Sequence, residues 1–256
     1  MKRFIGIMQF LTTIPLPFNT GIDTNFHKSA VYFPVVGLIL GLIYAGSAFF
    51  LNRIIEPALL SVIIVFIQVI MTGGLHIDGF GDTADGLFSY RDRERILEIM
   101  KDPRLGTNGF IGIFFLLTFK IILTYYILIH SLVLYIVFMP VFGRFAQICT
   151  GFISKPAKEN GMGNIFIGKI SKGLFTATCT ITIIILTIIS FSFKCSYMAI
   201  FIFIPFMAFS IILIRQFVYK KINGLTGDVL GAISESIEVI FLSYVLIYNM
   251  LFTLKL

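Results

Sequence analysis

Residues 31–51 read VYFPVVGLILGLIYAGSAFFL, a run of 21 residues without a charged side chain. A transmembrane helix needs about 20 mostly apolar residues, so this run is long enough to cross a bilayer. Six further apolar runs follow it, at 57–73, 110–129, 131–153, 174–193, 197–214 and 237–253. The sequence therefore predicts an all-α, polytopic membrane helical bundle with about seven transmembrane helices, in a single membrane domain covering residues 1–256.

The composition also favours a lipid environment. Of the 256 residues, 57% are hydrophobic and 13% are charged, whereas a soluble domain carries about 25% charged residues. The net charge of +7 is typical of cationic loops held on the cytoplasmic side. Aromatic and basic residues do not interleave as they do in single-strand binders, so we expect no nucleic acid partner. Three separated cysteines (Cys149, Cys179 and Cys195) indicate neither a disulfide framework nor a zinc site.

The segment 1–17, MKRFIGIMQFLTTIPLP, begins with two cations and an apolar stretch. It has no small-residue cleavage site, and it ends in a Pro-x-Pro turn. We interpret it as a retained interfacial or re-entrant helix rather than a removed signal peptide.

The basic residues alternate along the chain. Fifteen of the 20 Lys and Arg residues lie before the first span or in segments 74–109, 154–173 and 215–236. Only Arg53, Lys194 and Lys255 fall in the alternate connections. The positive-inside rule places the N-terminus and the basic segments in the cytoplasm, and seven spans then place the C-terminus outside. Twelve of the 13 acids also avoid the outer side, which favours an enzyme working at one surface over a transporter.

Three aspartates directly follow the second span, in the sequence GGLHIDGFGDTADG at 73–86. On a helix, Asp78, Asp82 and Asp85 at positions i, i+4 and i+7 share one face. Three clustered carboxylates repel one another unless a cation lies between them, and Mg²⁺ prefers oxygen ligands and bridges to phosphate. The alternative is a solvated acidic loop with glycine turns. His76 adjoins the triad but points away from it on a helix, as a proton carrier or a structural donor.

A second acidic pair lies near the C-terminus, after the sequence GLTGD at 224–228. Asp228 and Glu235 are seven residues apart and share a helix face. Two interpretations remain open: a helix N-cap, or ligands that complete the metal site on the same side of the membrane.

Basic side chains near the acids are candidates for binding an anion. Lys101 and Arg104 flank a glycine turn before the third span, either as an anion cradle or as a positive-inside anchor. Arg144 lies inside the fourth span, where it can reach the interface, pair with an acid or hold a phosphate. Lys120 lies mid-span with no obvious partner, and Gln68 is predicted to hydrogen-bond between helices. Segment 91–95, RDRER, is interpreted as a solvated, salt-bridged helix start.

The motif GGLHIDG followed by DTADGL, within 73–87, resembles the signature of the cobalamin synthase family, also called adenosylcobinamide-GDP ribazoletransferases. The likeness continues at FLTTIP (10–15), YFPVVG (32–37), EIMKD with RLG (98–106) and GLTGDVLGA with Glu235 (224–235). These motifs are spread over nearly the whole chain.

The resemblance implies an enzyme of the plasma membrane of a prokaryote, with its active site facing the cytoplasm. Its reaction joins adenosylcobinamide-GDP to α-ribazole or its 5′-phosphate, giving adenosylcobalamin or its phosphate and GMP, the last step of nucleotide-loop assembly. It implies Mg²⁺ as cofactor. The expected metal ligands are Asp78, Asp82, Asp85, Asp228 and Glu235. The expected substrate-binding residues are Lys101, Asp102, Arg104 and Arg144, and the expected catalytic residues are Asp82, Asp85 and His76.

Three rival interpretations fit the sequence less well. A CDP-alcohol phosphotransferase has a pattern that begins Asp-Gly-x-x-Ala-Arg and continues with a later Gly-x-x-x-Asp-x-x-x-Asp, and this pattern fails here because Asp78-Gly79 is followed by Gly81-Asp82. A divalent cation transporter predicts polar residues along several spans, and a structural scaffold leaves the spaced carboxylates unexplained. The sequence leaves open whether the chain forms a homo-oligomer.

Overall fold

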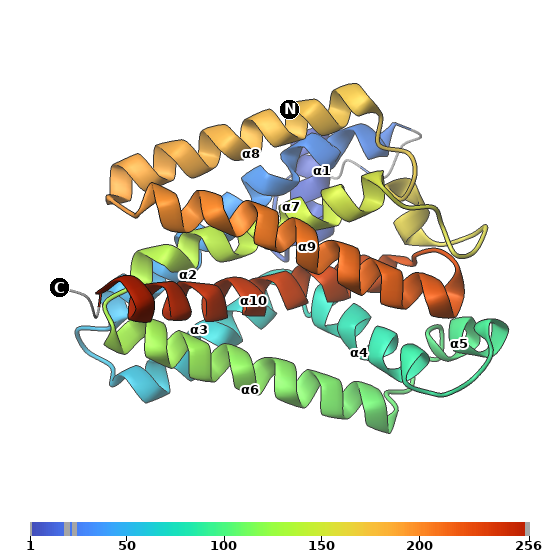
Figure 1. The fold of residues 1–256 in the computed structure, drawn as a ribbon, viewed down its shortest axis with the longest axis horizontal. Helices are drawn as coiled ribbons and strands as arrows, with labels where there is room; N and C mark the ends of the chain where they lie inside the picture. Colours follow the sequence, from blue (N-terminus) through green and yellow to red (C-terminus); the bar gives the residue numbers. More distant parts are fainter. Residues whose placement is uncertain (1, 18–20, 22–24, 254–256) are drawn as a thin grey trace.

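The computed structural model describes residues 2–17, 21 and 25–253 of the chain, and Figure 1 shows its fold. The predicted outer cation Lys255 lies outside the described residues. The elements in chain order are α1 (Lys2–Leu11), η1 (Phe26–Tyr32), α2 (Phe33–Leu51), α3 (Pro57–Thr72), α4 (Leu75–Leu87), α5 (Arg93–Ile99), α6 (Thr107–Ile129), η2 (Val133–Val137), α7 (Phe138–Phe152), η3 (Met162–Ile165), α8 (Lys172–Phe193), α9 (Tyr197–Ile222) and α10 (Gly227–Thr253).

The described part of the chain contains six helices that are long and apolar enough to cross a membrane. They are η1 with α2, then α6, η2 with α7, α8, α9 and α10. Helices α3 and α4 qualify together as a bent pair, which raises the number to seven. In order along the chain these segments match the seven predicted spans, so the predicted fold class is confirmed: the chain is an all-α polytopic membrane protein.

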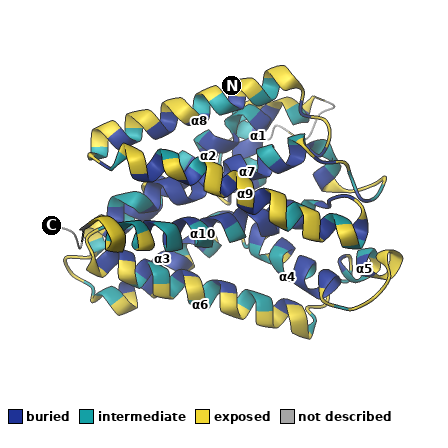
Figure 2. Ribbon diagram, viewed as in Figure 1, coloured by how far each residue is buried: buried dark blue, intermediate teal, exposed yellow. Residues whose placement is uncertain are grey.

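Two helices form the centre of the bundle. In its most apolar stretch, the η2–α7 segment has 83% of its residues buried and α10 has 61%, against 28% for α6, 28% for α8 and 33% for α9. Figure 2 shows the exposed residues of these outer helices along their outward faces. Large apolar side chains such as Phe119, Ile188 and Phe209 are exposed there, as expected where the solvent is lipid rather than water.

Helix α3 ends at a sharp elbow. Gly73 and Gly74 both have positive φ angles (59° and 72°), a conformation that glycine adopts without strain, and α4 leaves at 91° to α3. The N-terminal segment fixes this elbow: the amide of Thr13 donates to the Met71 carbonyl at 2.9 Å, and its hydroxyl donates to the Ile70 carbonyl at 2.8 Å. The elbow brings α4 against the start of α10.

The segment that precedes the first span is a helix, as predicted. Helix α1 is ten residues long, and it buries Ile7, Met8 and Leu11 while Lys2 and Arg3 are exposed. Its buried face therefore joins the core of the bundle.

The predicted loops are more helical than hydropathy indicated. Segment 74–109 contains α4 and α5, and segment 215–236 is helical except for residues 223–226. Hydropathy detects only the part of a helix that lies in hydrocarbon, whereas the backbone hydrogen bonds continue into the interface. Asp228 and Glu235 consequently both lie on α10, two turns apart.

Candidate active site

A cavity of about 330 Å³ opens at the end of the bundle where α2 and α10 begin and α7 ends. Its walls come from α1, α4, α7, α10, the turn after α5 and the loop between α7 and α8. The lining residues are Phe10, Leu11, Phe33, Leu75, His76, Asp78, Gly79, Met100, Lys101, Gln147, Ile148, Lys158, Gly161, Met162, Gly163, Phe166, Gly227, Asp228, Leu230 and Gly231. This volume lies at the lower end of the range for small-molecule sites, about 300–1,000 Å³.

Two acids and two bases line the cavity. Asp78 comes from α4, Asp228 from the first turn of α10, Lys101 from the turn after α5 and Lys158 from the α7–α8 loop. The charges of Asp78 and Asp228 both reach Asp82, one turn further along α4. Sequence reasoning predicted Asp78, Lys101 and Asp228, and the structure brings these three together.

Glycines allow α4 and α10 to approach closely. A Cβ atom on Gly79 would lie 2.9 Å from the carbonyl oxygen of Asp228, and one on Gly231 would lie 3.2 Å from the Cα of His76. Any larger residue at these positions would push the two helices apart. The close crossing is what places Asp78 and Asp228 in the same cavity.

Lys158 was not singled out by sequence reasoning, because it was one of many cations in the basic segments. The structure holds its loop against the turn before α10 through two backbone hydrogen bonds: Ala157 N to Leu225 O at 2.8 Å and Leu225 N to Lys155 O at 3.0 Å. Partial burial, and secondarily the positive charge of Lys101, lower the pKa of Lys158, while Asp228 and Asp82 act in the opposite direction. Lys158 reaches the cavity because these hydrogen bonds join two segments that are far apart in the sequence, so only the folded structure identifies it as a site residue.

Arg93 on α5 forms two further hydrogen bonds with the loop that carries Lys158 and with the end of α9. Its Nε donates to the Ile222 carbonyl at 3.0 Å, and its Nη2 donates to the Ala157 carbonyl at 2.5 Å. One guanidinium thus ties α5 to the end of α9 and to the loop that carries Lys158. Residues 91–95 form the solvated, salt-bridged helix start that the sequence predicted, and Arg93 adds these two long-range hydrogen bonds to it.

Asp85 has a different environment from Asp78 and Asp82. It is buried, and its two carboxylate oxygens accept hydrogen bonds from the amides of Gly106 at 2.7 Å and Gly109 at 2.8 Å. These amides belong to the first turn of α6, where free N–H groups attract an anion. The carboxylate therefore caps α6, and it does not line the cavity.

Asp102 and Arg104, both predicted to bind substrate, pair with each other instead. Arg104 donates from Nε to Asp102 Oδ1 at 2.9 Å and from Nη2 to Oδ2 at 2.7 Å. These hydrogen bonds lower the pKa of Asp102 to about 2. Neither residue lines the cavity, and Arg104 is largely exposed.

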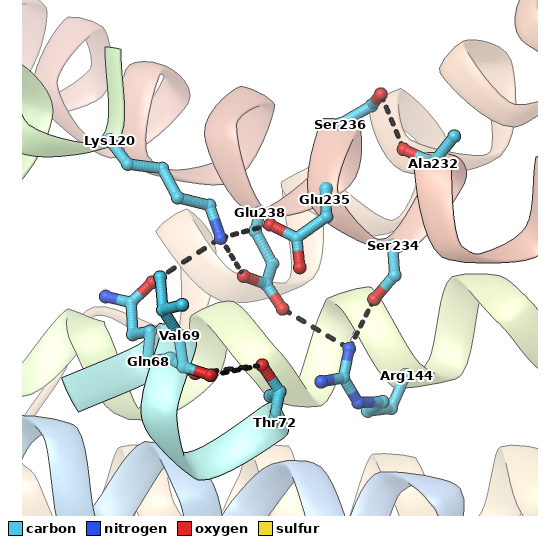
Figure 3. Close-up of polar contacts among 10 residues, drawn as sticks. All are labelled: Gln68, Val69, Thr72, Lys120, Arg144, Ala232, Ser234, Glu235, Ser236 and Glu238. Atoms are coloured by element: carbon cyan, nitrogen blue, oxygen red, sulfur yellow. Dashed lines mark hydrogen bonds and ion pairs between the residues drawn. The ribbon is translucent and has the colours of Figure 1, made fainter. Parts of the chain in front are cut away.

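Figure 3 shows a second polar cluster, deep among α3, α6, α7 and α10. Lys120 Nζ lies 2.5 Å from Glu235 Oε2 and 2.7 Å from Glu238 Oε2, and it donates to Gln68 Oε1 at 3.4 Å. The interhelical hydrogen bond predicted for Gln68 is confirmed. Lys120, for which the sequence showed no partner, has two acids within reach.

Arg144 joins the same cluster from α7 (Figure 3). Its Nη1 donates to Ser234 Oγ at 2.6 Å and lies 3.5 Å from Glu238 Oε1. Of the three uses that the sequence left open, the structure shows pairing with an acid. Glu235 and Arg144, predicted to bind metal and phosphate, therefore lie in a buried network of two cations and two anions rather than in the cavity.

Asp78, Asp82 and Asp228 are the carboxylates that are left to bind a magnesium ion. Within the described residues, no three His, Cys, Asp or Glu side chains are close enough to enclose a metal by themselves. Magnesium does not require such a cage, because it commonly takes one or two carboxylates together with waters and substrate phosphate. Asp78 and Asp228 line one cavity beside two lysines. Asp82 is close enough to interact electrostatically with both carboxylates. This donor set fits the ion when a phosphate is bound.

The chain is similar to known proteins over nearly its whole length. The family model for cobalamin-5-phosphate synthase matches residues 3–246. An adenosylcobinamide-GDP ribazoletransferase of Clostridioides difficile (strain 630) is 40% identical over 98% of this chain and 100% of its own length. Proteins of the same name from Alkaliphilus metalliredigens (38%, over 96% of each chain) and Caldanaerobacter subterraneus subsp. tengcongensis (35%, over 95% of this chain and 97% of the relative) are also similar. No solved structure is significantly similar to the chain. The chain belongs to the cobalamin-5-phosphate synthase family.

Proposed function

We propose that this protein joins adenosylcobinamide-GDP to α-ribazole or its 5′-phosphate, giving adenosylcobalamin or its 5′-phosphate and GMP. The observation that carries the proposal is the cavity lined by Asp78 and Asp228 beside Lys101 and Lys158. Carboxylates and cations facing one space suit a reaction at a diphosphate, where the protein mainly positions the reactants and offsets negative charge. Membership of the family supplies the identity of the two substrates.

The bond changes are those of an in-line displacement at phosphorus. The 3′-hydroxyl oxygen of the ribazole bonds to the phosphorus on the corrinoid side, and the bond from that phosphorus to the GMP oxygen breaks. The hydroxyl proton passes to a cavity carboxylate. Lys101 and Lys158 attract the phosphate oxygens and offset their charge. His76 lies in the same wall of the cavity.

The proposed reaction also uses a magnesium ion bound in the cavity. Asp78, Asp82 and Asp228 would hold the ion together with the substrate diphosphate. Bound there, it would supply a positive charge that stabilises the phosphate oxygens during the displacement. Asp85 and Glu235, which have partners of their own, would not be needed as ligands.

We further propose that the cavity faces the cytoplasm of a prokaryotic cell, with the N-terminus inside and the C-terminus outside. The support is electrostatic: fifteen of the 20 basic residues of the sequence lie in segments that connect at the end of the bundle bearing the cavity, and positive residues favour the cytoplasmic side.

The purified protein tests the reaction directly. GMP release is measured with adenosylcobinamide-GDP and α-ribazole, with and without Mg²⁺. We expect release only when both substrates and the metal are present, and a loss of about 100-fold or more in Asp228→Asn, because a group that offsets charge at the reacting centre is removed. Glu98→Gln is the matched control, since Glu98 is an exposed carboxylate near the same end that pairs with Arg95. GMP release without α-ribazole, or unchanged release in Asp228→Asn, would contradict the proposal.

A further inference from the structure

The cavity is small compared with one of the two proposed substrates. Its volume of about 330 Å³ is suited to a two-ring base with a ribose. A corrin macrocycle that carries an adenosyl ligand and a GDP arm is much too large to be enclosed in it. The larger substrate must therefore approach from the open side of the cavity, and the enclosed space is left for the smaller one.

The apolar part of the cavity lining has the chemistry of a site for a flat apolar ring. Phe10, Phe33 and Phe166 line it together, with ring centroids 5.1 Å apart for Phe33 and Phe166 and 6.0 Å apart for Phe10 and Phe166. Met100 and Met162 add polarizable side chains to the lining, and sulfur makes favourable contacts with aromatic rings. The two faces of an aromatic base would pack favourably against these side chains.

Two residues that line the cavity each carry a buried polar atom without a partner among the described residues. Gln147 is 5% exposed and His76 is 3% exposed, and Gln147 Oε1 and His76 Nδ1 are unpaired among the described residues. The amide nitrogen of Gln147 donates to the Leu230 carbonyl at 3.4 Å, which orients the oxygen as an acceptor. Burying an unpaired polar atom is costly, and a polar group of a ligand bound in the cavity would offset that cost. An acceptor oxygen pairs with a hydroxyl donor.

We infer that this cavity is the nucleoside subsite, in which the phenylalanines hold the base of α-ribazole while Gln147 and His76 bond the ribose hydroxyls. The inference rests on the proposed function. It places the sugar between the apolar wall and the charged residues Asp78 and Asp228, where the phosphorus is attacked. Adenosylcobinamide-GDP then binds across the opening.

The sequence offers a direct reporter, because it contains no tryptophan. Met162 lines the cavity and is 69% exposed, so Met162→Trp places one fluorophore at the entrance. We expect its emission to change on titration with α-ribazole alone, without the corrinoid substrate. Met198→Trp, an exposed position at the start of α9 outside the cavity lining, is the matched control and should not respond. If Met162→Trp does not respond at concentrations that saturate turnover, the subsite assignment is overturned.

A second measurement tests Gln147. Gln147→Met keeps the size of the side chain and removes the acceptor. In the Met162→Trp background we expect the Kd for α-ribazole to rise about tenfold, the value of one hydrogen bond near 1.4 kcal/mol. The KM for adenosylcobinamide-GDP should not change. Thr150→Val is the control: Thr150 is buried one turn away and bonds to the Ala146 carbonyl within its own helix.

The two proposals fail in distinguishable ways. A wild-type protein that binds α-ribazole but releases no GMP refutes the reaction and leaves the subsite standing. Normal turnover with an unchanged Kd in Gln147→Met, or with a raised KM for the corrinoid alone, refutes the role of Gln147. If Gln147→Met does not fold, the Met162→Trp titration still decides whether the cavity takes the nucleoside.

Discussion

Lys120 on α6 and Glu235 on α10 meet at 2.5 Å, both almost fully buried, although 115 residues separate them in the sequence. Glu238 and Arg144 complete a cluster of two cations and two anions. In a low-dielectric interior such charges persist only when they are paired. The cluster thus fixes how α10, which carries Asp228, is seated against α6 and α7.

Removal of Lys120 tests this seating. In Lys120→Met two buried carboxylates share one arginine, and we expect the free energy of unfolding to fall by about 3–5 kcal/mol. Lys120→Met/Glu235→Gln leaves the Arg144–Glu238 pair charge-balanced and should recover most of the loss. The measurement is thermal or denaturant unfolding in detergent micelles. Equal stability of the single and double variants would mean that charge balance does not govern the cluster.

Asp85→Asn separates helix capping from metal binding. The asparagine keeps one acceptor and turns a donor toward the α6 amides, so we expect a loss of about 1–3 kcal/mol of stability. The Mg²⁺ concentration that gives half-maximal GMP release should stay unchanged in this variant and rise in Asp78→Asn. A higher Mg²⁺ requirement in a folded Asp85→Asn protein would return Asp85 to the metal site.

Gly79→Val tests the close crossing of α4 and α10. Its Cβ would lie 2.9 Å from the Asp228 carbonyl oxygen, so the helices must separate, at a cost of about 1–3 kcal/mol. We expect turnover to fall more than tenfold because Asp78 and Asp228 move apart. Gly46→Ala is the matched control, since nothing lies within 4 Å of a Cβ there. Native turnover in Gly79→Val would show that the spacing of the two helices is not critical.

The pH dependence of substrate affinity reports on Lys158. Lysine is a cation only below its pKa, and the pKa of Lys158 lies below the ordinary 10.5, chiefly because of burial. Its attraction for phosphate should therefore be complete at low pH and fade as the pH rises through the lowered pKa, before an exposed lysine would lose its charge. The KM for adenosylcobinamide-GDP should rise in that alkaline range. In Lys158→Arg the rise should disappear, and an identical profile in both proteins would exclude Lys158.

Cysteine labelling in intact cells checks the orientation. In a background without Cys149, Cys179 and Cys195, a cysteine replaces either Glu94, on the cavity side, or Lys194, between α8 and α9. We expect an impermeant maleimide to label Lys194→Cys and to spare Glu94→Cys until the membrane is opened. The reverse pattern would place the cavity outside the cell.

The sequence predicted what depends on local pattern. Apolar runs of sufficient length marked the spans. Asp78, Asp82 and Asp85 lie on one helix, α4, which is the condition on which their predicted shared face depended. These features follow from the bilayer thickness and from backbone geometry, which a single stretch of chain encodes.

Contacts between residues that are far apart in the sequence could not be predicted from local patterns. Nothing local in the sequence pairs Lys120 with Glu235, or brings Lys158 beside Asp228, because each pair joins segments far apart in the chain. A shared helix also failed to predict a shared role. Asp85 lies on the same helix as Asp78, yet its carboxylate accepts hydrogen bonds from the amides at the start of α6. Long-range packing decides which of several suitable residues become site residues.

The elbow at Gly73-Gly74 also has a consequence for how the chain enters the bilayer during synthesis. A straight helix through residues 57–87 would present three aspartates to the translocon within one hydrophobic segment, at about 2.5–3.5 kcal/mol for each one near the helix centre. Because the chain turns by 91° before the first aspartate, the 16 residues of α3 contain no charged side chain, and the aspartates belong to a helix of different direction. The same two glycines that aim the carboxylates thus make the segment carrying them insertable.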